Sequence, residues 1–398
     1  MVQPHPGVIT RIIDDTLVLF SELRQETHTL DGVTGYLWCL LEGQEGPGEM
    51  ADKLAAATGE PLYQAKKTVE KCLRNWSRHG FLDDAAGAAV SETVLPLVAT
   101  VHRKGSTAAP RPPADWICLH TVEIAGQAVE LRFDDVAIED CIMPLFDHLA
   151  TASGAASERA PLRLDISSHG TRYDIFCNAD CVAQCHRLDE LAPSTERALT
   201  QLLLDVLGHE MVLPAAAVLR DGETTVVPAK SGVQRTALTA ALIGAGYSYL
   251  CDGNLLYDGR SGVRGLGLCL AIEPGSLAGL ASRYPSLADV REHIGPDLKR
   301  VRYLPPPASS LSEPRRQPNK WWPVGTIVLP KHRTARGPEL RDAGRTDALK
   351  QLMGEAYFPD HLLSKRQFSM LAGLLNAVAC KELIYDDPDQ AAEVLRLL

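Results

Sequence analysis

The sequence predicts two domains of different class, an α+β module over residues 1–84 and a larger α/β domain over residues 116–398. Three observations support this prediction. Short β-branched runs precede helix-forming segments in the first part of the chain. Residues 85–115 are rich in Ala, Gly and Pro and contain too little apolar side chain to build a core, which predicts a linker. Beyond this linker, strand-like and helix-like segments follow one another.

Composition excludes several classes of protein. The chain has 398 residues, 45% of them hydrophobic and 23% charged, which is typical of a globular protein of two or three domains. The formal net charge of -10 argues against general nucleic-acid binding. No apolar run reaches the ~18 residues of a membrane span, and the N-terminus has no secretory pattern. We therefore expect a cytoplasmic protein with no nucleic-acid or membrane partner, whose ten cysteines are mostly free thiols.

The N-terminal module has clear element boundaries. Asp14-Asp15 predicts a tight turn between two strands, Asp31 is a good N-cap, and Pro61 suits the first turn of a helix. The predicted elements are strands at 8–13, 16–20 and 27–30, followed by helices at 33–41, 49–57 and 62–79. Three small strands followed by three helices is a winged-helix arrangement, and we expect residues 1–84 to fold independently.

The third strand and the third helix of this module predict a binding groove. The strand, Thr27 to Leu30, is a candidate sheet edge, which offers backbone donors and acceptors to an extended peptide. The helix carries five basic residues and one acid: Lys66, Lys67, Lys71, Arg74 and Arg78 against Glu70. Such a helix would suit an acidic peptide. Two alternatives are an ordinary solvated helix face and a DNA-binding winged helix, and the overall acidity argues against the second.

Short motifs spread over the whole module carry a resemblance to a known family. They are LDGVTG at 30–35, LLEG at 40–43, EMADKL at 49–54 and WSRHGFL at 76–82. The module resembles the PqqD-like RiPP recognition elements, which bind leader peptides during maturation of ribosomally made peptides. The resemblance implies a precursor peptide as one partner and a separate modifying enzyme as the other. It also implies a set of peptide-binding residues: Thr27, His28, Thr29, Leu30, Lys66, Lys67, Val69, Lys71 and Arg74.

A degenerate phosphate loop lies in the larger domain, between a strand and a helix. When residues 228–238 are aligned with GxxxxGK[ST], Ala229 takes the first glycine position and Gln234 the second. Arg235 replaces the lysine and Thr236 keeps the hydroxyl. The whole site is Ala229, Ser231, Gly232, Gln234, Arg235, Thr236 and Asp252.

Residues 195–398 resemble HPr kinase/phosphorylase, with residues 116–194 as a β-rich lead-in. The small-residue strand 214–219, the helix end LIGAG at 242–246 and the strand YLCDG at 249–253 carry this resemblance. The family usually has paired acids after that last strand, but here Asp252 is followed by glycine. Pro214 also stands where relatives commonly have histidine.

These departures imply that phosphoryl transfer is lost, because it depends on positioning and charge stabilisation. Gln234 removes the backbone freedom of the second glycine, and the fork of Arg235 does not replace a compact ammonium. If Arg235 and Asp252 are close, we expect them to form an ion pair. Two interpretations stay open: a scaffold without nucleotide, or an anion held by Ser231, Arg235 and Thr236 at the helix N-terminus. No cofactor is expected.

A cysteine cluster gives a weaker signal. Cys177, Cys181, Cys185 and His186 could hold zinc or an iron–sulfur cluster. However, residues 172–187 read as a hairpin, which favours ordinary buried thiols and no bound metal. Farther along, residues 305–314 (PPPASSLSEP) predict an exposed loop, with Trp321-Trp322 anchoring the chain after it.

The sequence therefore favours a leader-peptide recognition element fused to a catalytically inactive kinase-like scaffold. One alternative is an active HPr-kinase-like peptide or protein serine kinase, which would require ATP and magnesium. The other is a metal-dependent peptide-modifying enzyme built on the cysteine cluster.

Overall fold

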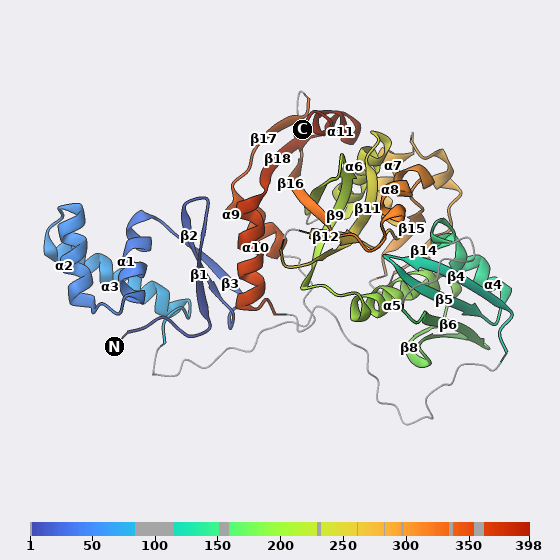
Figure 1. The fold of residues 1–398 in the computed structure, drawn as a ribbon, viewed down its shortest axis with the longest axis horizontal. Helices are drawn as coiled ribbons and strands as arrows, with labels where there is room; N and C mark the ends of the chain where they lie inside the picture. Colours follow the sequence, from blue (N-terminus) through green and yellow to red (C-terminus); the bar gives the residue numbers. More distant parts are fainter. Residues whose placement is uncertain are drawn as a thin grey trace. The chain divides into compact units, whose positions relative to one another are not determined.

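The chain forms two compact units. The structure is a computed structural model, and it describes residues 2–83, 115–150, 159–228, 232–260, 262–281, 283–295, 298–333, 337–353 and 362–398. The first unit comprises residues 1–107 with residues 358–376, and the second comprises residues 108–357 with residues 377–398 (Figure 1). Apart from Asp115, the predicted linker lies outside the described residues.

Three strands and three helices form the N-terminal part of the first unit, as the sequence predicts. The strands are β1 (Val8–Ile13), β2 (Thr16–Ser21) and β3 (Glu26–Leu30), paired antiparallel in the order β1-β2-β3. The helices are α1 (Gly32–Glu42), α2 (Pro47–Thr58) and α3 (Leu62–Arg78). Asp14 and Asp15 take positive φ angles in the β1–β2 turn. Asp31 caps α1 by accepting a hydrogen bond from the Thr34 backbone amide at 2.8 Å.

The three helices cover one face of this sheet. Trp38 and Trp76 meet edge to face, with ring centroids 5.0 Å apart. The indole N–H of Trp38 donates to Glu42 at 2.9 Å, so the buried ring keeps its polar atom satisfied. Leu19 and Leu30 contribute to the same core from the sheet.

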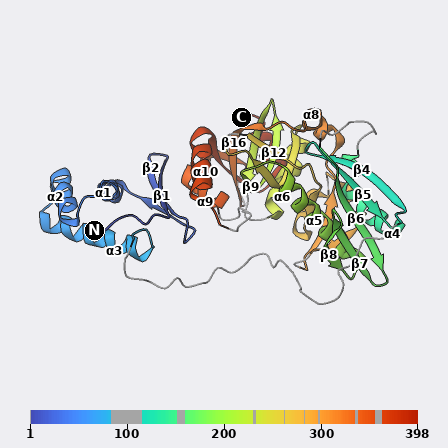
Figure 2. The same ribbon diagram turned by 60° about the horizontal axis from the view of Figure 1, so that its bottom comes forward.

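Helix α10 (Lys365–Ala377), from near the other end of the sequence, packs on this unit as well. Figures 1 and 2 both place it beside the β1–β2–β3 sheet. Phe368 stacks on Phe20 of β2 with ring centroids 4.7 Å apart, and both side chains are fully buried. The Glu22 carboxylate accepts a hydrogen bond from the Lys365 backbone amide at 3.0 Å, in the first turn of α10. The sequence analysis did not assign this helix to the N-terminal module.

A five-stranded sheet opens the larger unit, in the order β4-β5-β6-β7-β8. Its strands are β4 (Cys118–Ile124), β5 (Gln127–Phe133), β6 (Leu162–His169), β7 (Arg172–Cys177) and β8 (Asp180–Cys185). Only the β5–β6 pair among them is parallel. Helices α4 (Val136–Ile142) and α5 (Leu191–Val206) share a core with this sheet. The same core includes Leu256 and Tyr303, so the β-rich lead-in and the following segment are packed together.

A seven-stranded sheet forms the centre of this unit, in the order β10-β9-β11-β12-β16-β18-β17. Its strands are β9 (Met211–Arg220), β10 (Glu223–Pro228), β11 (Ser248–Tyr257), β12 (Gly262–Gly265), β16 (Trp322–His332), β17 (Glu339–Asp342) and β18 (Ala379–Tyr385). Strand β10 also pairs with β16, so five of these strands form a closed circuit of pairings. Asp221 and Gly222 form the turn between β9 and β10, with positive φ at both residues.

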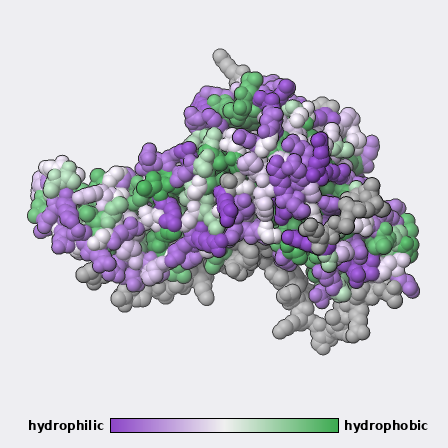
Figure 3. Space-filling model, viewed as in Figure 1, coloured by the Kyte–Doolittle hydropathy of each residue, from purple (hydrophilic) through white to green (hydrophobic). Residues whose placement is uncertain are grey.

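Smaller elements complete the larger unit. A three-stranded sheet has the order β13-β15-β14, with β13 (Leu270–Ile272), β14 (Glu292–Ile294) and β15 (Arg300–Leu304). The helices are α6 (Gly232–Gly244), α7 (Pro274–Leu280), α8 (Ser312–Arg316), α9 (Arg345–Met353) and α11 (Pro388–Leu395), with short 3-10 turns η1 (Met143–Leu145), η2 (Asp147–Leu149), η3 (Leu188–Glu190), η4 (Pro285–Ala288) and η5 (Ala308–Leu311). Among the described helices, none is long and apolar enough to cross a lipid bilayer. Hydrophilic residues cover most of the face drawn in Figure 3.

The expected exposed loop at residues 305–314 is wrong in part. Turn η5 and helix α8 order this segment, and Leu311 is only 3% exposed. Leu311 belongs to a core cluster with Leu270 and Leu304. One apolar residue within a Pro-rich and Ser-rich run is thus enough to dock the segment. The predicted anchor after it is present, because Trp322 is buried at the start of β16.

Candidate functional site

Strand β3 is an edge of its sheet, as predicted. It pairs with β2 from Glu26 to Leu30, and in the described part of the chain no strand pairs with its other side. Backbone groups along such an edge have their hydrogen-bonding capacity free for an added strand. This edge is therefore chemically suited to strand addition.

The C-terminal end of helix α3 lies near the start of strand β3. Near the start of the strand, the His79 ring nitrogen lies 3.5 Å from the Glu26 carboxylate, and the rings of His28 and His79 are 5.2 Å apart. Near the end of the strand, Asp31 is close to Cys72 of α3. Burial raises the pKa of the Cys72 thiol, and the charge of Asp31 raises it further. The C-terminal part of α3 thus lies near β3, and a groove between the strand edge and the solvent side of this helix stays a prediction.

The structure divides the predicted peptide-binding residues into two groups. Seven are accessible: Thr27 and His28 are partly exposed, and Thr29, Lys66, Lys67, Lys71 and Arg74 are exposed. The other two, Leu30 and Val69, are 4% and 1% exposed and belong to the core of the unit. A peptide could meet Leu30 only through its backbone. The expected contact with the Val69 side chain is wrong, because Val69 lies on the buried stripe of α3.

Electrostatics differ between the two walls. Burial lowers the pKa of His28, and the neighbouring His79 lowers it further against an opposing effect of Glu26. On α3 the lysine side chains are exposed, while Arg74 lies 4.0 Å from Glu70. The exposed positive charges among the predicted peptide-binding residues therefore lie on helix α3.

The degenerate phosphate loop has the expected strand-to-helix context, since β10 ends at Pro228 and α6 begins at Gly232. Ala229 and Ser231 lie outside the described residues. Gln234 falls in the first turn of α6. Arg235 and Thr236 follow it on the same helix, and Asp252 lies on β11.

Arg235 and Asp252 form the predicted ion pair. The Arg235 Nε donates to Asp252 Oδ1 at 2.9 Å, and the Thr236 hydroxyl donates to Asp252 Oδ2 at 2.6 Å. The Asp252 side chain is only 1% exposed. Burial lowers the pKa of Arg235, but the charge of Asp252 and the hydrogen bond outweigh it, so the pKa is raised. The two side chains that would meet a phosphate are thus already bound to a carboxylate.

A second acid near this pair was missed by the sequence reasoning. Burial raises the pKa of Glu196 on α5 to about 7, a hydrogen bond from the Tyr303 hydroxyl opposes the rise, and the charge of Asp252 adds to it. The β9–β10 hairpin and helix α6 separate Glu196 from Asp252 in the sequence, so only tertiary packing brings their charges together. No short motif could have identified it.

The cysteine cluster lies on the β7–β8 hairpin, which turns at Asn178 and Ala179 with positive φ angles. Cys177 and Cys185 are buried in the core, Cys181 is partly exposed, and His186 is exposed. Burial raises the pKa of all three thiols, that of Cys177 to about 12. Within the described residues, no group of three His, Cys, Asp or Glu side chains is arranged to hold a metal ion.

Comparisons with known proteins give little further information. No protein-family model matches the sequence, and no curated protein matches it. A solved structure of TbiB1 in complex with the TbiA(beta) leader peptide is similar to part of the chain. It has 25% sequence identity, covers 21% of this chain and 99% of that chain, and gives a TM-score of 0.20. A TM-score at this level does not establish a shared fold.

Proposed function

We propose that the first unit binds an extended segment of a ribosomally made precursor peptide, which adds as a strand to β3. The chain then presents this peptide to a separate modifying enzyme. The observation that carries the proposal is the edge of β3, which no described strand covers, with the C-terminal end of the basic helix α3 close to the start of that strand. Strand addition supplies affinity through backbone hydrogen bonds, and side chains along the groove supply selectivity.

Charge complementarity supports an acidic peptide. Lys67, Lys71 and Arg74 are spaced at helical intervals on the exposed side of α3. The chain as a whole carries a net charge of -10, so the basic side of α3 differs in the sign of its charge from the chain overall. A basic wall would steer an acidic leader segment toward the edge and fix its position there.

The larger unit is proposed to serve as a kinase-like scaffold without phosphoryl transfer. Arg235 and Thr236 both donate hydrogen bonds to the buried Asp252 carboxylate. A phosphate would have to displace a buried, charge-assisted hydrogen bond before it could bind these side chains. The ion pair therefore supports loss of the ancestral chemistry.

Fluorescence anisotropy on the full chain tests peptide binding. The probe is a labelled acidic, partly apolar peptide. We expect the combined Lys67→Glu and Lys71→Glu variant to bind at least about tenfold more weakly at low salt, with a smaller salt dependence. A matched variant with Lys350→Glu and Arg260→Glu changes the net charge equally on exposed residues of the larger unit. It should bind like the wild type.

N-methylated peptides test strand addition itself. Adjacent residues of an added strand direct their amides to opposite sides, so only every second amide would face β3. Methylation of one alternating set should abolish binding, and methylation of the other set should leave it nearly intact. Equal effects of both sets, or unchanged affinity in the charge-reversed variant, would remove the proposal.

A further inference from the structure

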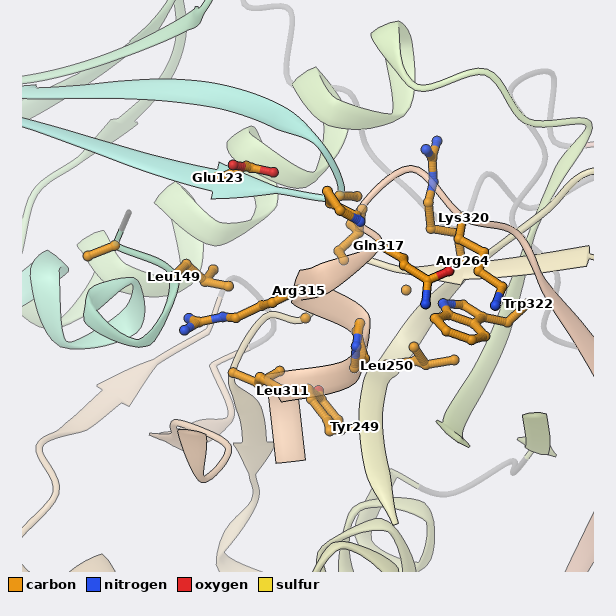
Figure 4. A pocket seen from close by; sticks show the side chains of 17 residues that line it. Glu123, Leu149, Tyr249, Leu250, Arg264, Leu311, Arg315, Gln317, Lys320 and Trp322 are labelled. Atoms are coloured by element: carbon orange, nitrogen blue, oxygen red, sulfur yellow. The ribbon is translucent and has the colours of Figure 1, made fainter. Parts of the chain in front are cut away.

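A second candidate site is a cavity in the larger unit, away from the degenerate phosphate loop. It has a volume of about 290 Å³ and lies among the ends of β4, β11 and β12, helix α8 and the start of β16 (Figure 4). Apolar side chains supply part of its wall, including Leu250, Leu311 and Trp322. Polar side chains with one dominant sign of charge supply the rest.

The charged lining is mainly basic. Arg264, Arg315 and Lys320 line the cavity, against one carboxylate, that of Glu123. In Figure 4, Arg264 and Lys320 lie on the same side of the cavity as Trp322, whereas Arg315 extends in the opposite direction. Lys320 Nζ lies 3.8 Å from the centroid of the Trp322 ring. An excess of positive charge in a partly apolar cavity favours an anion.

Arg264 is the most informative residue of this cavity. It is only 7% exposed, its Nε has no hydrogen-bond partner, and among the described residues no carboxylate forms an ion pair with it. Its guanidinium lies 4.6 Å from the centroid of the Trp321 ring, which stabilises a cation but does not neutralise it. Burial, together with the charge of Arg159, lowers the pKa of Arg264. A buried guanidinium without an anionic partner is costly to fold, so a ligand anion that pairs with it would remove part of this cost.

We propose that this cavity binds a small organic anion, whose carboxylate or phosphate group meets Arg264 and Lys320. The apolar part of the ligand would pack against Trp322 and Leu311. The planar fork of an arginine suits both anionic groups, and a lysine adds a point charge. A volume of about 290 Å³ is at the lower end for ligand sites, so one ring with one anionic group is a suitable size.

Isothermal titration calorimetry on the full chain tests the site with three probes: benzoate, phenyl phosphate and neutral benzamide. We expect saturable binding of at least one anion and none of benzamide up to about 10 mM. The stronger of the two anions identifies the group that the site prefers. Failure of both anions to bind, or equal binding of benzamide, would overturn the proposal.

Variants locate the binding and separate it from folding. Arg264→Met should abolish anion binding without lowering the melting temperature, because methionine replaces an unpaired buried charge with an apolar chain. Lys320→Gln, at a more exposed position, should weaken binding about tenfold. Arg316→Gln, next to the cavity but not lining it, should bind like the wild type. If Arg264→Met and Lys320→Gln both retain wild-type affinity, the anion binds elsewhere and the assignment is wrong.

Discussion

At the scale of single residues, the degenerate phosphate loop is organised around Asp252. This carboxylate is almost fully buried and accepts hydrogen bonds from Arg235 and Thr236. Sequence could predict the ion pair, because Arg235 opens a helix after one strand and Asp252 lies on the next strand, at positions that a phosphate loop brings together. Sequence could not predict Glu196, whose altered pKa depends on how α5 packs.

Arg235→Ala should lower the free energy of unfolding of the larger unit by about 3 kcal/mol, because it leaves the Asp252 charge buried without a partner. The double variant Arg235→Ala and Asp252→Ala should recover part of this loss, since both charges are then absent. Urea unfolding of the wild type, both single variants and the double variant measures the difference. An additive double variant would show that the pair is not coupled.

Glu196→Gln should change the pH dependence of stability. The pKa of Glu196 is raised to about 7 in the folded protein from an ordinary value of 4.5, so the folded state binds more protons between these values. The contribution of protonated Glu196 to the free energy of unfolding is fully present below pH 4.5 and is lost as the pH rises through 7. The free energy of unfolding of the variant should therefore rise relative to that of the wild type between pH 5 and 8, by at most about 3 kcal/mol.

Melting temperatures of the two proteins across this pH range test the prediction. The comparison cancels the titration of all other groups, provided that they respond alike in both proteins. A difference that stays constant from pH 5 to 8 would show that Glu196 titrates normally.

At the scale of elements, local chemistry determined what could be predicted. The turns at Asp14-Asp15, Asn178-Ala179 and Asp221-Gly222 all have positive φ angles, and each is found where residue types predict a hairpin. The packing of α10 on the N-terminal sheet could not be predicted, because Phe20 and Phe368 are distant in sequence. One signal was available: the run Leu17–Phe20 has no polar alternation, which indicates a strand covered on both faces.

Phe368→Ala should lower the free energy of unfolding of the first unit by about 3 to 5 kcal/mol, because it empties a fully buried contact with Phe20. Gly373→Ala, on an exposed position of the same helix where an added Cβ meets nothing within 4 Å, should be neutral or slightly stabilising. Denaturant midpoints of the two variants measure this contrast.

Because Phe368 of α10 packs on Phe20, a fragment that ends at residue 84 should be less stable than the unit with α10. This revises the expectation that residues 1–84 fold independently.

At the scale of the whole molecule, sequence correctly predicted an N-terminal part of three strands and three helices before a larger α/β unit. It did not give the sheet architecture of the larger unit, where β10 pairs with both β9 and β16. Pairings between strands so distant in the chain depend on the collective packing of the sheet and leave no local pattern. The kinase-like ancestry of this unit accordingly stays a prediction.

The full chain should show no phosphate release from ATP and no phosphoryl transfer to a peptide, with at most weak nucleotide binding. A working phosphate loop directs several backbone amides at the β-phosphate, and Gln234 stands where that geometry needs glycine. Restoring glycine at this position and lysine at 235 should raise nucleotide affinity more than activity, because magnesium would still lack a normally ionised second acid beside Asp252.

Calorimetry with ATP and magnesium, together with a phosphate-release assay, separates the possibilities. Binding in the millimolar range without turnover is the expected result. Micromolar ATP binding that Arg235→Ala abolishes, with transfer to a peptide, would establish the kinase instead. In that case the Arg235–Asp252 pair would have to open on nucleotide binding, and the Asp252 carboxylate released from it would be the residue available to magnesium.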